Sequence, residues 1–179
     1  MKTLLFIIVA IFLSACSTKS SYLLPTSNVL HIKTVKTQIG VKEVEVPDYL
    51  DGDKILVKDG LKIEEIGSNF AAPPSKLLTQ NVIKILKKSL NNPYVFLYPW
   101  DVKSKKGLIV DIKLDNFLYD SRYCIVEGTY YIKNANGTIK FAKNFKYQEL
   151  ADKNPNNIIM TLSALFDKVA LEIAQKIAK

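Results

Sequence analysis

The chain has 179 residues, of which 48% are hydrophobic and 23% are charged, with only two cysteines and one histidine. A domain of this length buries about 70% of the surface of its unfolded chain, so a core can form without disulfides or metals. The formal net charge of +8 comes from lysines scattered along the chain, which indicates a solvated lysine-rich surface, with attraction to anionic lipid as the second interpretation and no nucleic-acid partner expected.

The first fifteen residues have the three parts of a secretory signal peptide. Lys2 supplies a positive start, residues 4–13 are an unbroken apolar run, and Ser14 and Ala15 are small. The run is about half of the ~20 residues that a helix needs to cross a bilayer. The sequence therefore predicts removal of residues 1–15 and disfavours a permanent transmembrane anchor.

The next feature is the cysteine that follows this run. Residues 13–16 (LSAC) resemble the bacterial lipobox, in which the cysteine sulfur receives a diacylglyceryl group and the new amine is acylated, commonly with palmitate. The resemblance implies lipidation of Cys16, and two or more acyl chains hold a protein stably on a membrane. Ser17, where an aspartate would retain the protein, favours the periplasmic face of the outer membrane over that of the inner membrane. An ordinary signal peptide with a chance cysteine is the alternative.

Residues 17–28 are polar and rich in serine and threonine. Together with Cys16 they predict a lipidated N-terminus and tether over 16–28. Residues 29–179 contain no repeat or low-complexity tract and are predicted to form one periplasmic domain.

The first half of this domain alternates strand and turn patterns before a helix. In chain order the sequence predicts one or two strands over 29–46, a turn-rich break over 47–53, and a hairpin of strands 54–58 and 61–66. A loop over 69–74 then leads to an amphipathic helix that begins at Ser75 and ends at 91–93 (NNP).

The second half repeats this order with longer strands. The sequence predicts a short aromatic strand over 94–98, a strand over 108–117, a hairpin of 123–133 and 138–147 around the turn 134–137, and an amphipathic helix over 156–178. The succession of strands, helix, strands and helix predicts a single α+β domain, a mostly antiparallel sheet with two amphipathic helices packed on one face.

No group of residues forms a recognisable catalytic or metal site. Asp48, Asp51 and Asp53 lack the further oxygen ligands of a calcium loop, so turn chemistry explains them better. His31 is the only histidine, which excludes a histidine-rich metal site and leaves a nucleophile without a base. Cys124 lies within an apolar strand, where a buried inert thiol is expected. We therefore expect no enzyme and no cofactor other than the covalent lipid.

Aromatic residues are concentrated in the middle of the chain. They are Tyr94, Phe96, Tyr98 and Trp100, with Phe117 and Tyr119 nearby. Core packing explains most of them, and the others are candidates for a lipid-contacting or subunit surface.

Several segments match a known family in order and spacing. Residues 46–52 (VPDYLDG) resemble the V-P-x-Y-L signature of ABC-type transport auxiliary lipoproteins, the PqiC/YmbA-like family. Residues 22–25, 69–74 with the following helix, and 115–120 with 126–128 are similar to its other conserved stretches, as is the last helix. The departure is at 70–73 (FAAP), where the family usually has a tryptophan.

The resemblance implies a non-enzymatic accessory lipoprotein that works with an MCE-domain protein and an ABC permease and ATPase in intermembrane lipid transport. It implies a docking or outer-membrane terminus role, and a ring of copies is possible. Our candidate partner-binding residues are Pro47, Asp48, Tyr49, Leu50 and Trp100. Two alternatives remain: a periplasmic lipid-binding chaperone, which needs a deep apolar cavity, and a structural or assembly lipoprotein of an envelope complex.

Overall fold

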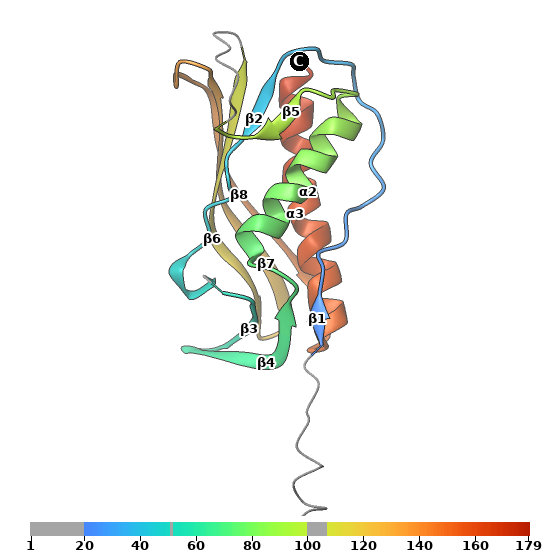
Figure 1. Ribbon diagram of the computed structural model, residues 1–179. Helices are drawn as coiled ribbons and strands as arrows, with labels where there is room; N and C mark the ends of the chain where they lie inside the picture. The colour runs from blue at the N-terminus through green and yellow to red at the C-terminus, as the bar shows by residue number, and fades with distance from the viewer. Residues whose placement is uncertain (1–19, 51, 100–106) are drawn as a thin grey trace, which may run out of the picture.

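The computed structural model describes residues 20–50, 52–99 and 107–179. Its strands form one eight-stranded sheet, and two helices cover one face of it (Figure 1). The long strand pairs are antiparallel, whereas the parallel pairs are short. The predicted α+β class is therefore confirmed.

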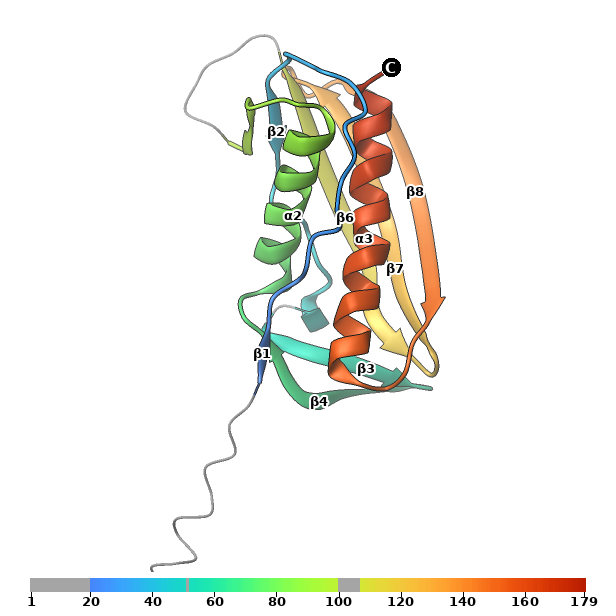
Figure 2. The same cartoon turned by 90° about the vertical axis from the view of Figure 1, so that its right-hand side faces the viewer.

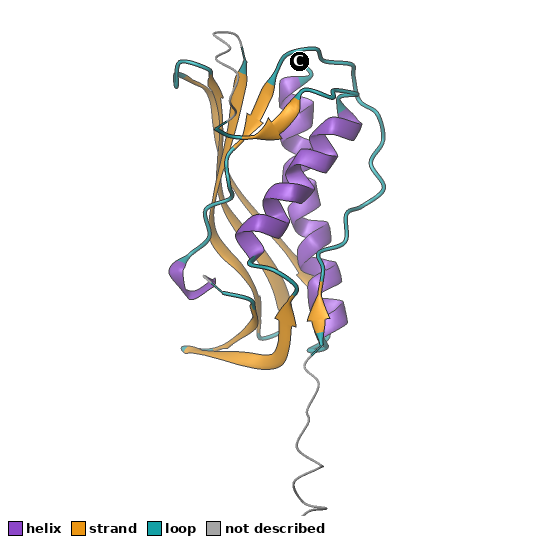
Figure 3. Cartoon of the chain, in the orientation of Figure 1, coloured by secondary structure: helices purple, strands orange, loops and turns teal. Residues whose placement is uncertain are grey.

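The elements follow the predicted order (Figure 3). The strands are β1 (Ser21–Tyr22), β2 (Ile39–Val41), β3 (Lys54–Asp59), β4 (Lys62–Phe70), β5 (Val95–Leu97), β6 (Leu108–Asp120), β7 (Tyr123–Asn134) and β8 (Ile139–Leu150). The helices are the 3-10 turn η1 (Asp48–Leu50), α2 (Pro74–Ser89) and α3 (Pro155–Ile177). Both predicted hairpins are confirmed, and the ends of both predicted helices are right to within about two residues.

The core fills the space between the sheet and the helices. Along β7 every second side chain is buried, including those of Val126 and Tyr130, because successive residues of a strand point to opposite faces. Phe166 of α3 meets Phe117 of β6 edge-to-face, with ring centroids 6.5 Å apart. Neither helix of the described part is long and apolar enough to cross a membrane.

The segment before β2 differs from the prediction. Only Ile39–Val41 and a single bridge at Glu45 pair as strand in the predicted 29–46 region. The amides of Ile32 and Val35 instead donate to the carbonyls of Ser89 and Leu90, at 2.7 and 3.0 Å. Carbonyls at a helix end lack partners within the helix, so they can accept hydrogen bonds from the amides of this segment, which then needs no neighbouring strand. The predicted loop over 69–74 is also shorter, since Asn69 and Phe70 belong to β4.

The described part of the predicted tether, residues 20–28, packs on the domain rather than extending away. β1 pairs in parallel with the end of β4, and Leu24 is buried. The Pro25 carbonyl accepts hydrogen bonds from Asn81 of α2 and Ser163 of α3. Figure 2 shows this segment running along the two helices away from β1. Residues 20–28 are thus fixed to both helices.

A buried carboxyl group of α3 lies against the same segment. Asp167 of α3 is buried, its Oδ2 accepts from the Ser27 amide at 2.7 Å, and its Oδ1 has no partner. Burial raises the pKa of this carboxyl, although the hydrogen bonds from Ser27 act in the opposite direction. The folded state therefore binds the proton more tightly than the unfolded chain, and stability should rise as the pH falls through the folded-state pKa.

Replacement of Asp167 by asparagine is expected to stabilise the domain by about 1 kcal/mol at pH 7, because the Ser27 hydrogen bond can remain while the buried charge is removed. Urea unfolding at pH 7 would measure the gain. The advantage should shrink at pH 4, where the wild-type carboxyl takes up its proton. A destabilised variant at pH 7 would contradict this account.

Candidate docking surface at the β5 edge

The predicted partner-binding residues of the 47–50 turn divide into buried and exposed groups. Leu50 is buried in the core, and its amide donates to the Pro47 carbonyl at 2.8 Å. Asp48 and Tyr49 are exposed. The structure therefore leaves Asp48 and the Tyr49 ring accessible to a partner, whereas Leu50 holds the turn in place.

The Tyr49 hydroxyl ties this turn to β6. It donates to the Asp115 carbonyl oxygen at 3.0 Å and lies 3.2 Å from Asn116 Oδ1. Partial burial raises the pKa of Tyr49, and the negative charges of Asp115 and Glu127 raise it further. The hydroxyl thus stays protonated and keeps its hydrogen bond, which is a structural role. The candidate residues Cys16 and Trp100, and Asp51 of the acidic cluster, lie outside the described residues.

Two exposed aromatic side chains lie on β5 and at the residue before it. Tyr94, Phe96 and Leu97 are 54%, 41% and 52% exposed, whereas Val95 is buried. Lys87 of α2 lies over the Phe96 ring, 5.6 Å from its centroid. Of the six aromatic residues that the sequence analysis grouped together, Tyr94 and Phe96 are therefore exposed, whereas Phe117 and Tyr119 belong to the core.

A groove continues this surface onto α2. Its volume is about 230 Å³, and its lining residues are Glu43, Lys76, Thr79, Gln80, Ile83 and Leu97. Ile83 and Leu97 provide an apolar wall, and Glu43 and Lys76 provide a charge of each sign. Together Tyr94, Phe96, Leu97 and this groove form what we call the β5 surface, which combines apolar area with a polar rim as protein interfaces do.

The backbone of β5 is also available on one side. The Tyr94 carbonyl accepts from Ile39, and the Tyr98 amide donates to Val41, so these residues face β2. Alternate residues of a strand bond to opposite sides, and the backbone groups of Val95 and Leu97 therefore face away from β2. No described strand pairs with that side. Such an edge can accept a strand from another chain.

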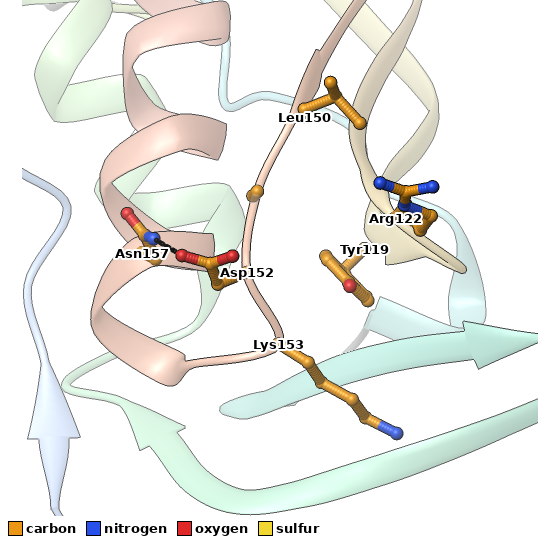
Figure 4. Close-up of a pocket in the computed structure, with 7 residues that line it drawn as sticks. Tyr119, Arg122, Leu150, Asp152, Lys153 and Asn157 are labelled. Atoms are coloured by element: carbon orange, nitrogen blue, oxygen red, sulfur yellow. Dashed lines mark hydrogen bonds between the residues drawn. The ribbon is translucent and has the colours of Figure 1, made fainter.

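A second pocket lies at the other end of the domain (Figure 4). It measures about 410 Å³, and its walls come from the β6–β7 turn and the segment that leads into α3. The lining side chains that Figure 4 labels are Tyr119, Arg122, Leu150, Asp152, Lys153 and Asn157. Asp152 accepts from Asn157 at 3.0 Å, which leaves this carboxylate engaged in the structure of the loop.

Cys124 has the environment of an unreactive thiol. It is buried, its Sγ lies 3.6 Å from the Ile158 carbonyl, and burial raises the pKa to about 12, with a smaller effect from Glu149. Among residues 20–50, 52–99 and 107–179, no three His, Cys, Asp or Glu side chains are arranged to hold a metal.

Comparison with known proteins gives one family and several similar folds. Residues 22–174 match the sequence profile of the family described as ABC-type transport auxiliary lipoprotein component. No curated protein matches the chain in sequence. A crystal structure of an uncharacterized protein has a TM-score of 0.72 at 18% identity and covers 90% of this chain and 99% of that one. A Xanthomonas campestris protein has a TM-score of 0.75 at 14% identity, with coverage of 88% and 94%. At these identities the structural likeness establishes the fold.

Proposed function

Because the chain belongs to the family of ABC-type transport auxiliary lipoprotein components, we propose that it docks an MCE-type lipid transport system to a membrane without catalysing a reaction. Membership of this family indicates a membrane-anchored periplasmic protein whose partner is an ABC transporter system. The finer parts of the proposal are the lipid on Cys16, the outer membrane as its location, and an MCE-domain protein as the direct partner.

The observation that carries the proposal is the placement of the β5 surface relative to the anchor. Ser21 of β1 is five positions after Cys16 in the sequence, and an extended chain of five residue steps reaches at most ~18 Å. β1 lies at one end of the domain and β5 toward the other (Figure 1). α3 runs between the two ends, and its 23 residues span about 35 Å. An anchored domain would therefore hold its β5 surface away from the membrane, toward a partner.

The interior favours docking over lipid carriage. The largest fully buried side chains, among them Tyr130, Phe117 and Phe166, fill the space between the sheet and the helices. A lipid-binding chaperone needs an apolar cavity in that position. The packed interior of the described residues gives that alternative no support, whereas an exposed apolar edge with a groove is what a docking component requires.

Two variants separate the anchor from the docking surface. Cys16→Ser should move the protein from the membrane pellet to the soluble fraction of the cell envelope. Phe96→Ser/Leu97→Ser should stay in the membrane pellet but retain at least about tenfold less MCE-domain protein on affinity purification in a neutral detergent, because exposed apolar anchors dominate interfaces. The apolar residues Leu61 and Met160 lie outside this surface and are 103% and 58% exposed, so Leu61→Ser/Met160→Ser is the matched control.

Each part of the proposal can fail separately. Sedimentation of the Cys16→Ser variant with the membranes would contradict the proposed lipid anchor. Equal recovery of MCE-domain protein with the Phe96/Leu97 variant and with the control would contradict the β5 surface as the docking site. A cross-linked partner outside any lipid transport system would favour the structural or assembly alternative.

A further inference from the structure

A pocket of about 290 Å³ lies where α3 ends against the sheet. Its apolar lining comes from three strands and the helix, through Leu108, Ile132, Phe141 and Ile177. Three lysines complete it, Lys140 from β8 and Lys176 and Lys179 from the end of α3 and beyond. We call these seven residues the basic pocket. It is separate from the β5 surface, which has none of these residues.

The three lysines of the basic pocket form no salt bridge within the described part of the chain. Eight lysines of the described chain form salt bridges with a carboxylate, and Lys140, Lys176 and Lys179 are not among them. Lys33 lies close by, and its Nζ donates to the Ala178 carbonyl at 2.7 Å. Four lysines, Lys33 among them, therefore lie around the end of α3 and take part in none of the salt bridges of the described residues, which favours binding of an anion here.

A bulge in the strand pairing directs Lys140 into the pocket. Ile132 lies opposite Phe141, and Lys133 lies opposite Ile139, so Lys140 is an extra residue in β8. Neighbouring residues of a regular strand point to opposite faces, yet Lys140 and Phe141 both line the pocket. A bulge is a common means of redirecting a side chain next to a functional site. The irregularity thus adds a cation to the apolar pocket.

Simpler roles explain only part of this arrangement. Lys176 lies over the Phe141 ring, 4.5 Å from its centroid, and lysines near a helix C-terminus interact favourably with its dipole. Neither effect involves Lys140, and the Lys33 ammonium already bonds a carbonyl at that helix end. An acidic peptide would meet the lysines, but its backbone would need hydrogen-bond partners that four apolar side chains do not offer.

We propose that the basic pocket binds the headgroup of an anionic phospholipid, with the phosphate against the lysines and the first methylene groups against Phe141 and Ile177. The proposal rests on the proposed function for the source of the lipid, since α3 ends far from β1 and from the leaflet that holds the anchor (Figure 2). A lipid in transit from the partner would supply the headgroup. The binding step itself needs no partner protein, so it can be tested separately.

The test uses the full lipidated protein, purified in a neutral maltoside detergent and incubated with equimolar phosphatidylglycerol and phosphatidylcholine of the same acyl chains. Native mass spectrometry should show a phosphatidylglycerol adduct in excess over phosphatidylcholine. Lys140→Gln/Lys176→Gln should reduce the phosphatidylglycerol adduct by about tenfold or more, because it removes two charge-assisted hydrogen bonds. Lys140→Arg/Lys176→Arg should retain binding.

The control variant is Lys146→Gln/Lys168→Gln, which removes the same charge from lysines whose side chains are 56% and 53% exposed elsewhere. It should bind phosphatidylglycerol as the wild type does. Equal binding of the two lipids, or equal loss in both glutamine variants, would overturn the proposal. Complete displacement of the lipid by millimolar inorganic phosphate would indicate a free-anion site instead, and binding of a polyglutamate peptide without phosphatidylglycerol binding would indicate an acidic protein partner.

Discussion

Replacement of Gly128 by alanine is expected to destabilise the domain by about 3 kcal/mol or more. A Cβ atom at this position would overlap the Lys113 carbonyl oxygen and lie 2.9 Å from Leu114 Cα. Both atoms belong to the backbone of β6, which cannot move aside as a flexible side chain can. Overpacking of this kind costs about 1–3 kcal/mol when side chains must shift, and more when strands must separate.

The large loss of stability expected for Gly128→Ala also reflects the contacts that β6 and β7 make around this position. Gly128 of β7 lies opposite Leu114, and Glu127 lies opposite Asn116, so Asp115 is an extra residue in β6. The carbonyl of this bulged residue accepts the hydrogen bond from Tyr49. Two separate sequence motifs, the 46–52 segment and the 126–128 segment, therefore meet at one bulge. A shift of β6 at Gly128 would also loosen the Tyr49 turn.

Denaturant unfolding of Gly128→Ala beside Gly52→Ala measures the contact directly. A Cβ at Gly52 would have no neighbour within 4 Å, so this control should stay within about 0.5 kcal/mol of the wild type. Equal stability of the two variants would show that β6 and β7 do not approach each other this closely.

Local signals predicted the elements that have local causes. The 134–137 turn contains Asn136-Gly137, and Gly137 adopts a φ of +88°, a value that glycine reaches without steric cost. The alternating pattern on each side then fixed the β7–β8 hairpin. The last helix followed in the same way from its apolar spacing, and the structure adds Asn154 as its cap and Pro155 at its first position.

The errors lie where distant residues supply the partners. The 29–38 segment has an alternating pattern, but its amides reach the end of α2, some 55 residues further along the chain. The polar composition of 17–28 predicted a tether, whereas the described part of it, residues 20–28, has hydrogen bonds to Asn81, Ser163 and Asp167 of the two helices. Sequence spacing carries no information about such contacts.

The candidate binding surfaces also depend on contacts between residues that are distant in the sequence, so the sequence predicted them only in part. Aromatic composition indicated a possible interface over 94–100, and the structure separates exposed Tyr94 and Phe96 from buried Val95. The basic pocket escaped the sequence analysis entirely, because Lys140 and Lys176 are 36 residues apart and only the β8 bulge directs the first toward the second. A run of lysines would have been visible, whereas a cluster assembled by packing is not.

Replacement of Asp111 by asparagine is the second change with a large expected effect, a loss of about 2 kcal/mol at pH 7. Asp111 of β6 is 1% exposed, and its Oδ2 lies 2.6 Å from Lys133 Nζ and 3.0 Å from Lys42 Nζ. Removal of one member of a buried ion pair leaves the other charge uncompensated and costs about 3–5 kcal/mol. Lys133 and Lys42 are 21% and 37% exposed, so water offsets part of that cost.

The dependence on pH distinguishes a charge effect from a packing effect. Burial alone would raise the pKa of Asp111, but the hydrogen bonds and charges of Lys133 and Lys42 outweigh it and hold the pKa below its ordinary value of 3.8. A carboxyl with a lowered folded-state pKa stabilises the fold above its unfolded-state pKa and loses that contribution as the pH falls through the folded-state value. The stability gap between the wild type and Asp111→Asn should therefore be constant from pH 7 to pH 5 and shrink below about pH 4.

Urea unfolding at pH 7, 5 and 3 measures this gap, and Glu45→Gln is the control. Glu45 pairs with Lys113 of β6 at 2.7 Å, but both side chains are about half exposed, so loss of this pair should change stability by under about 1 kcal/mol at every pH. A gap for Asp111→Asn that persists unchanged at pH 3 would mean that the amide disturbs packing, and that the two lysines do not need the carboxylate charge. A gap that closes with acid would identify Asp111 as the anion that lets Lys42, which follows β2, and Lys133 of β7 both lie close to the same carboxylate.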